Sequence, residues 1–147
     1  MKRILIATDG SDGAWVAVEE GIALASETDA RVTFVTVRHP VSGLFGDPVY
    51  QHHLTHQLAH ARAALEPAEA EAERAGVDFE SEILEGEPVG CIIEAARAWD
   101  ADLVVVGSRG HGVVTSALLG SVSRALIKHS PAPVMIVRTT SRAGAAA

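Results

Sequence analysis

Short strand-like apolar runs alternate along this chain with longer segments in which apolar residues recur every three or four positions. The apolar runs are typical of buried strands and occupy Ile4 to Ala7, Val32 to Val37, Phe79 to Leu84, Leu103 to Val106 and Val134 to Val137. The segments between them have helical periodicity. Regular alternation of strands and helices predicts an α/β fold, an open five-stranded parallel sheet of the Rossmann type with helices on both faces.

Three of the four helical segments also carry recognisable end signals. The first, from about Asp12 to Ser26, follows Ser11, a residue type that often caps a helix N-terminus. The third follows Pro88, which is favoured in the first turn, and the fourth ends near His129. Each segment is expected to bury one apolar face: Ala14, Val18, Ile22 and Ala25; Val89, Ile92, Ile93 and Ala96; Leu118, Val122, Ala125 and Leu126.

The second helical segment, from about Val49 to Ala75, is unusually long and contains Pro67, which predicts a kink or an interruption. Its apolar stripe consists of Leu54, Leu58, Ala61 and Leu65. On roughly the opposite side lie three histidines at four-residue spacing, His52, His56 and His60. Neighbouring turns bring such rings close enough to bind a transition metal, but no cysteine or carboxylate completes a ligand set there. The pattern favours a solvated face, with adventitious zinc or nickel binding as the alternative.

The overall composition is that of one globular domain. The chain has 147 residues, 48% hydrophobic and 21% charged, which is enough to bury a substantial core. We expect residues 1–138 to form a single domain and the small, polar tail 139–147 to be frayed. The glycines and prolines between Arg38 and Pro48 predict a flexible surface loop, which could close over a bound ligand.

Charge and cysteine content narrow the classes of partner and compartment. Twelve Lys and Arg residues against nineteen Asp and Glu residues give a net charge of −7, which leaves no basic surface for nucleic acid or anionic lipid. The single cysteine, Cys91, has no partner for an internal disulfide and is expected to be a small buried side chain. Since neither a signal peptide nor a transmembrane stretch is recognisable, we expect a cytoplasmic protein.

Small residues follow the fourth strand in a pattern that suits a phosphate chain. Gly107 and Gly110 are followed after nine residues by Gly120, and the hydroxyl residues Ser121 and Ser123 come next. Glycine lets backbone N–H groups approach an anion, and the positive end of a helix favours the same anion. Arg109 lies between the first two glycines, where its guanidinium is suited to pair with phosphate.

A second unusual segment, Ala7-Thr8-Asp9, ends the first strand. Ligands of open parallel sheets bind beyond the carboxyl ends of the strands, where the strand order reverses. If both segments serve one site, the first and fourth strands are neighbours and the order is 3-2-1-4-5. Asp9 then suits a sugar hydroxyl or Mg²⁺, which takes one or two carboxylates plus phosphate oxygens; the alternative is that it caps the first helix.

Other phosphate and catalytic motifs are missing from the sequence. It contains no G-x-x-x-x-G-K-[ST], whose lysine supports phosphoryl transfer, and no G-x-G-x-x-G after the first strand. A dinucleotide dehydrogenase is therefore a poor interpretation, and no residue is securely identified as orienting water or an acceptor.

In these features the sequence resembles the universal stress protein family from Lys2 to about Arg138. The resemblance rests on four segments: residues 4–11 (ILIATDGS), 102–110 (DLVVVGSRG), 120–123 (GSVS) and 131–137 (PAPVMIV). In that family the spacing G-x2-G-x9-G-[ST] is typical of members that bind ATP. Gly107, Gly110, Gly120 and Ser121 satisfy its fixed positions.

The resemblance implies a role for each matching position. Asp9 would lie near ribose and Mg²⁺, and Val37 and Val106 would border the adenine. The nucleotide-binding set it implies is Ala7, Thr8, Asp9, Val37, Val106, Gly107, Arg109, Gly110, Gly120, Ser121, Val122 and Ser123. It also implies a homodimer through the last strand, Val134 to Val137.

Three functions follow as alternatives. The leading hypothesis is a cytoplasmic ATP-binding switch module of the stress response, acting on an unidentified protein partner. The others are a slow Mg²⁺-dependent ATPase or phosphotransferase, and a dimeric scaffold that binds no nucleotide.

Overall fold

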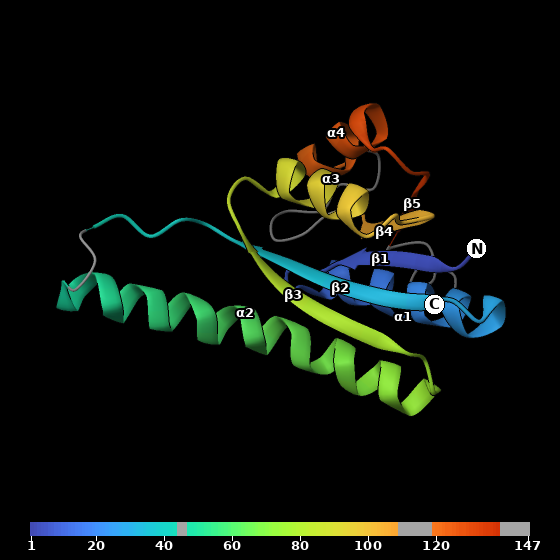
Figure 1. The fold of residues 1–147 in the computed structure, drawn as a ribbon, viewed down its shortest axis with the longest axis horizontal. Coiled ribbons are helices and arrows are strands. Elements are labelled where there is room, and N and C mark those ends of the chain that lie inside the picture. The colour runs from blue at the N-terminus through green and yellow to red at the C-terminus, as the bar shows by residue number, and fades with distance from the viewer. Residues whose placement is uncertain (44–46, 109–118, 139–147) are drawn as a thin grey trace, which may run out of the picture.

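A computed structural model describes residues 1–43, 47–108 and 119–138. Within them the chain forms an open parallel sheet with the strand order β3-β2-β1-β4-β5, as predicted (Figure 1). The elements are β1 Arg3–Ala7, α1 Asp12–Thr28, β2 Arg31–Arg38, α2 Pro48–Ala75, β3 Phe79–Glu85, α3 Pro88–Ala98, β4 Leu103–Gly107, α4 Ser121–His129 and β5 Val134–Val137. The sequence pattern therefore located the five strands and the first two helices to within two residues at each end.

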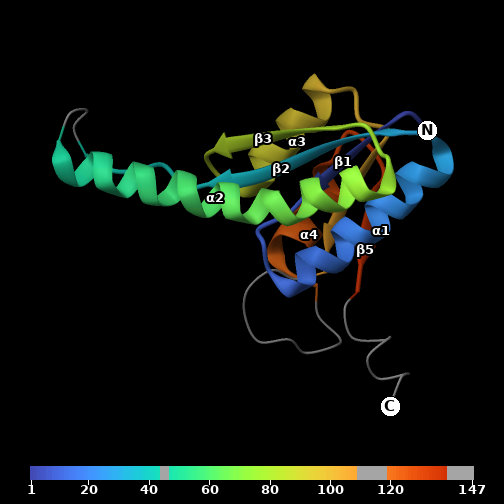
Figure 2. The ribbon, with the colours of Figure 1, turned by 90° about the horizontal axis from the view of Figure 1, so that it is seen from below.

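The helices form one layer on each face of the sheet (Figures 1 and 2). Side chains of α1 and α2 share an apolar cluster with Ile4 and Ile6 of β1, whereas α3 and α4 share a second cluster with Leu5 of the same strand. Because successive side chains of a strand point to opposite faces, the central strand β1 contributes to both layers. These three side chains are at most 1% exposed.

Side chains cap the first three helices. Ser11 is the N-cap of α1, as predicted, and its Oγ accepts a hydrogen bond from the Ala14 N–H at 3.2 Å. Asp47 caps α2 through the Val49 N–H, and Glu87 caps α3 through the N–H groups of Val89 and Gly90. The two bonds donated to Glu87 lower the pKa of its carboxyl, because they favour the charged form.

Two expectations next to β2 and α3 need correction. Arg38 belongs to β2 rather than to the following loop, and its Nη2 donates to Glu85 Oε2 at 2.6 Å on neighbouring β3. Cys91 is half-buried rather than buried, and its Sγ lies 3.5 Å from the Glu85 carbonyl oxygen. Burial, together with the nearby Glu94 and Glu87, raises the pKa of this thiol and so favours its protonated form.

Helix α2 runs from Pro48 to Ala75 through Pro67, so of the two effects expected of this proline the interruption is wrong. Pro67 is exposed, whereas the neighbouring Ala64, Leu65 and Ala68 are buried against the sheet. Packing of this face holds the helix together although proline removes one backbone hydrogen bond. The first half of α2 extends beyond the sheet in both views (Figures 1 and 2).

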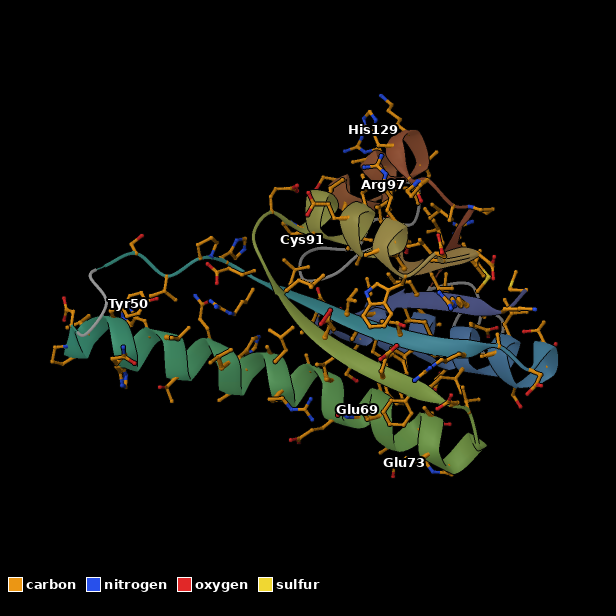
Figure 3. All side chains as sticks on the ribbon, viewed as in Figure 1. Tyr50, Glu69, Glu73, Cys91, Arg97 and His129 are labelled. Atoms are coloured by element: carbon orange, nitrogen blue, oxygen red, sulfur yellow. The ribbon has the colours of Figure 1, made fainter. Side chains whose placement is uncertain are left out.

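The proline is expected to destabilise the helix that it leaves intact. We expect Pro67→Ala to raise the free energy of unfolding by about 2 kcal/mol, since alanine restores the N–H and removes the ring clash. Urea denaturation measures the change. Glu73→Ala, at an exposed position of the same helix (Figure 3), is the control and is expected to change the free energy by less than about 0.5 kcal/mol. Equal or lower stability of Pro67→Ala would show that the proline is not a site of strain.

Candidate functional site

The candidate site lies where β1 and β4 end side by side. Ile6 of β1 pairs with Phe34 of β2 on one side and with Val105 of β4 on the other. From β1 the chain continues through α1 to β2, whereas β4 leads the opposite way to β5. This reversal of strand order leaves an opening for ligands in sheets of this type. The ends of β1 and β4, where the two unusual segments of the sequence begin, are therefore adjacent, as expected.

The loop after β1 is held by its own polar groups. The buried Thr8 donates its N–H to the Val35 carbonyl at 2.9 Å, and its Oγ1 accepts from the Gly10 N–H at 3.2 Å. Asp9 is exposed, and its Oδ1 accepts from the Ser11 N–H at 2.9 Å. Asp9 thus shapes the loop before α1, while the capping bond to α1 comes from Ser11. Gly10 has a φ of +81°, which explains a glycine at the turn.

Gly107, the last residue of β4, lies against the start of α1. A Cβ atom at this position would be 2.5 Å from the Gly13 carbonyl oxygen and 3.3 Å from the Ala14 nitrogen. Both obstacles are backbone atoms and have little freedom to move. The glycine is therefore required for packing between β4 and α1, a role that the sequence analysis did not assign to it.

The start of α4 is bonded to the end of β4. The Gly120 N–H donates to the Ser108 carbonyl at 2.8 Å, and the Ser123 hydroxyl donates to the Gly107 carbonyl at 2.9 Å. Ser123 is only 3% exposed, so its hydroxyl serves this junction rather than facing outward. Gly120 is the N-cap of α4 and supplies no side-chain bond to the helix, and Ser121 is exposed at the first helical position. The first N–H groups of an α-helix have no partner within it, which suits this end to an anion.

The apolar residues expected near the adenosine belong to one cluster. Ala7, Val37 and Val106 all pack in the cluster beneath α3 and α4, together with Val122 of α4. Ala7 and Val37 are half-buried, whereas Val106 is 5% exposed and offers little surface to a ligand. Arg109 and Gly110 lie outside the described residues.

Asp9 is the residue expected to bind a metal ion. Within the described ranges, no three His, Cys, Asp or Glu side chains are grouped closely enough to hold an ion by themselves. A magnesium ion bound mainly by phosphate oxygens needs only one or two carboxylates from the protein. Asp9, exposed beside the end of β4, fits that limited role.

The described residues also contain no helix long and apolar enough to span a bilayer.

The packing role of Gly107 predicts a loss of stability on substitution. We expect Gly107→Ala to lower the free energy of unfolding by about 2 kcal/mol, because the added methyl group collides with backbone of α1. Gly90→Ala is the control: its added Cβ would lie 3.3 Å from a side-chain oxygen of Glu87 rather than 2.5 Å from backbone, and alanine is favoured over glycine within a helix. Denaturant unfolding of both variants distinguishes them, and equal stabilities would contradict the close contact.

Comparison with known proteins identifies relatives along nearly the whole chain. The model of the universal stress protein family matches residues 1–138. The universal stress protein in the QAH/OAS sulfhydrylase 3′ region of Thermus aquaticus is 38% identical over 137 residues, covering 93% of this chain and 98% of that protein.

Solved structures agree with the sequence match. Universal stress protein UspA from Lactobacillus plantarum superimposes with a TM-score of 0.82 at 26% identity, covering 93% of this chain and 97% of that one. A universal stress protein in complex with cAMP has a TM-score of 0.74 at 31% identity, covering 95% and 98%. The chain therefore belongs to the universal stress protein family.

Proposed function

We propose that this protein binds ATP with Mg²⁺ where β1, β4 and the start of α4 meet, and acts as a nucleotide-dependent switch in the stress response. The observation that carries the proposal is the N-terminus of α4. It has no side-chain cap from Gly120, and hydrogen bonds join it to the C-terminal end of β4. A relative binds cAMP, an adenine nucleotide, which supports the ligand class.

The phosphates bind at the start of α4 in this proposal. The backbone N–H groups of Ser121, Val122 and Ser123 and the exposed Ser121 hydroxyl act as donors. Since the Ser123 hydroxyl already donates to Gly107, Ser123 contributes its backbone N–H. By the family resemblance, Arg109 and Gly110 complete the phosphate site.

The nucleoside binds at the other side of the junction. Thr8 and the exposed Asp9 lie at the end of β1, where the carboxylate accepts from ribose hydroxyls or binds Mg²⁺ together with phosphate oxygens. The half-buried side chains of Ala7 and Val37 contact the adenine, with Val106 behind them. For occupancy to act as a switch, ATP must bind two conformations of the protein with different affinity.

We further propose that two copies associate through β5. This strand lies at one edge of the sheet, and its four residues, Val134–Val137, are all half-buried. An apolar edge has unpaired backbone groups and must be covered or paired. Pairing with a second copy would satisfy them.

Sedimentation equilibrium tests the dimer. We expect the apparent mass to approach twice 15.4 kDa at micromolar concentration and to be independent of ATP if the edge alone drives association. A single 15.4 kDa species at all concentrations would exclude pairing through β5.

A charge placed at the start of α4 tests the nucleotide site without disturbing the fold. We expect Ser121→Asp to weaken ATP binding at least tenfold, because its carboxylate repels the phosphates, while the same charge stabilises the helix N-terminus. Ser121→Asn, which has nearly the same shape without the charge, is expected to stay within about threefold of wild type. Isothermal titration calorimetry with ATP, with and without Mg²⁺, measures both.

Three outcomes of this titration decide the proposal. Selective loss in Ser121→Asp and tighter binding with Mg²⁺ would support it. Equal ATP affinities of the two variants would show that the phosphates do not bind at the start of α4. If wild-type protein binds no ATP, cAMP or AMP, the nucleotide function itself fails.

A further inference from the structure

The first half of α2 is an arm that extends beyond the sheet (Figures 1 and 2) and has one fully exposed face. The buried residues of this helix begin at Ala61, and the preceding part, about three and a half turns at 3.6 residues per turn, contains none. Both ribbon views show this part extending beyond the sheet (Figures 1 and 2). Because helix capping by Asp47 and the continuous helix behind it fix the backbone, side chains on the arm have defined relative positions.

Four histidines lie on one face of this arm. At about 100° per residue, His52, His53, His56 and His60 fall within an arc of about 100°. Their centre is roughly opposite the buried face formed by Leu65, Ala68 and Ala72. All four histidines are exposed, as the sequence analysis expected for this face.

The spacing forms two chelating pairs that share a residue. His52 and His56 are four residues apart, and so are His56 and His60, which places each pair on adjacent turns of the same face. The rings of His52 and His53 are also close, with centroids 6.3 Å apart. His56 is therefore central to the set.

Within the described part of the chain, these imidazoles have no competing partner. None of the four forms a hydrogen bond or an ion pair there. Metal binding would therefore break no interaction that stabilises the fold. Because the rings are already exposed to solvent, no core packing has to open for them to reach a metal ion.

The donor set selects the type of metal. The sequence from Pro48 to Leu65 contains no Asp, Glu or Cys, so the ligands are imidazole nitrogens alone. Imidazole suits Cu²⁺, Ni²⁺ and Zn²⁺, whereas Mg²⁺ and Ca²⁺ require oxygen ligands. No three such side chains of the described residues are grouped to hold an ion together, so the chain offers two-nitrogen clamps rather than a closed cage.

We propose that the His52, His56 and His60 face of α2 binds a divalent transition metal between neighbouring imidazoles, with Cu²⁺ preferred. The order of preference follows the general rise of affinity from Ni²⁺ to Cu²⁺ and its fall to Zn²⁺. Water fills the remaining coordination positions, which stay accessible because the four histidines are exposed. Metal binding at this face does not require the proposed nucleotide function.

Calorimetric titration of the whole protein with Cu²⁺, Ni²⁺ and Zn²⁺ tests this site. We expect His56→Ala to weaken Cu²⁺ binding at least tenfold, because it removes the residue common to both pairs. Binding is also expected to fall as the pH is lowered, since protonated imidazole does not bind metal. Electron paramagnetic resonance of the Cu²⁺-loaded wild type is expected to show nitrogen ligation that the variant loses.

His129→Ala is the matched control, since His129 is an exposed histidine on α4, across the sheet from α2 (Figure 3). It is expected to bind Cu²⁺ like wild type, and Mg²⁺ is expected to bind neither variant through this face. Equal Cu²⁺ affinities of wild type and His56→Ala, or equal losses in the two variants, would overturn the proposal. Unchanged circular dichroism and unchanged ATP titration of His56→Ala would show that any loss is local to the arm.

Discussion

The close contact between Gly107 and Gly13 is the constraint on which the candidate site depends. Backbone of β4 meets backbone of α1 where any larger residue would place Cβ 2.5 Å from a carbonyl oxygen. Gly107 also accepts the hydroxyl bond of Ser123, so one residue fixes the start of α1 and the start of α4 relative to each other. Close packing of this kind tolerates little change in volume, and the geometry of the junction is correspondingly rigid.

Most of the fold follows from sequence because its patterns are local. Strand-like runs such as Leu103 to Val106 and helix signals such as Ser11 and Pro88 lie within the elements that they predict. The continuous helix through Pro67 could not be predicted in this way. Its integrity depends on burial of Ala64, Leu65 and Ala68 against a sheet formed by distant residues, and tertiary packing outweighs local propensity there.

The location of the candidate site was predictable from the sequence, but its hydrogen bonds were not. Asp9 and Gly107 follow strands that the alternating pattern makes neighbours, so their proximity follows from topology. The bond between Ser123 and Gly107 joins residues sixteen positions apart, and no local pattern indicates it. Sequence identified a hydroxyl residue near a helix start, whereas only the structure distinguishes the buried Ser123 from the exposed Ser121.

Helix α2 connects the histidine face to the nucleotide junction. A Cβ at Gly10, next to Asp9, would lie 3.1 Å from the Ala64 Cβ, and the helix runs unbroken from Ala64 back to His56. A rigid helix is a direct physical connection, but connection alone is not coupling. Energetic coupling requires two arrangements of the loop after β1 that a metal on the arm stabilises unequally, and linkage then requires ATP to alter metal affinity by the same factor.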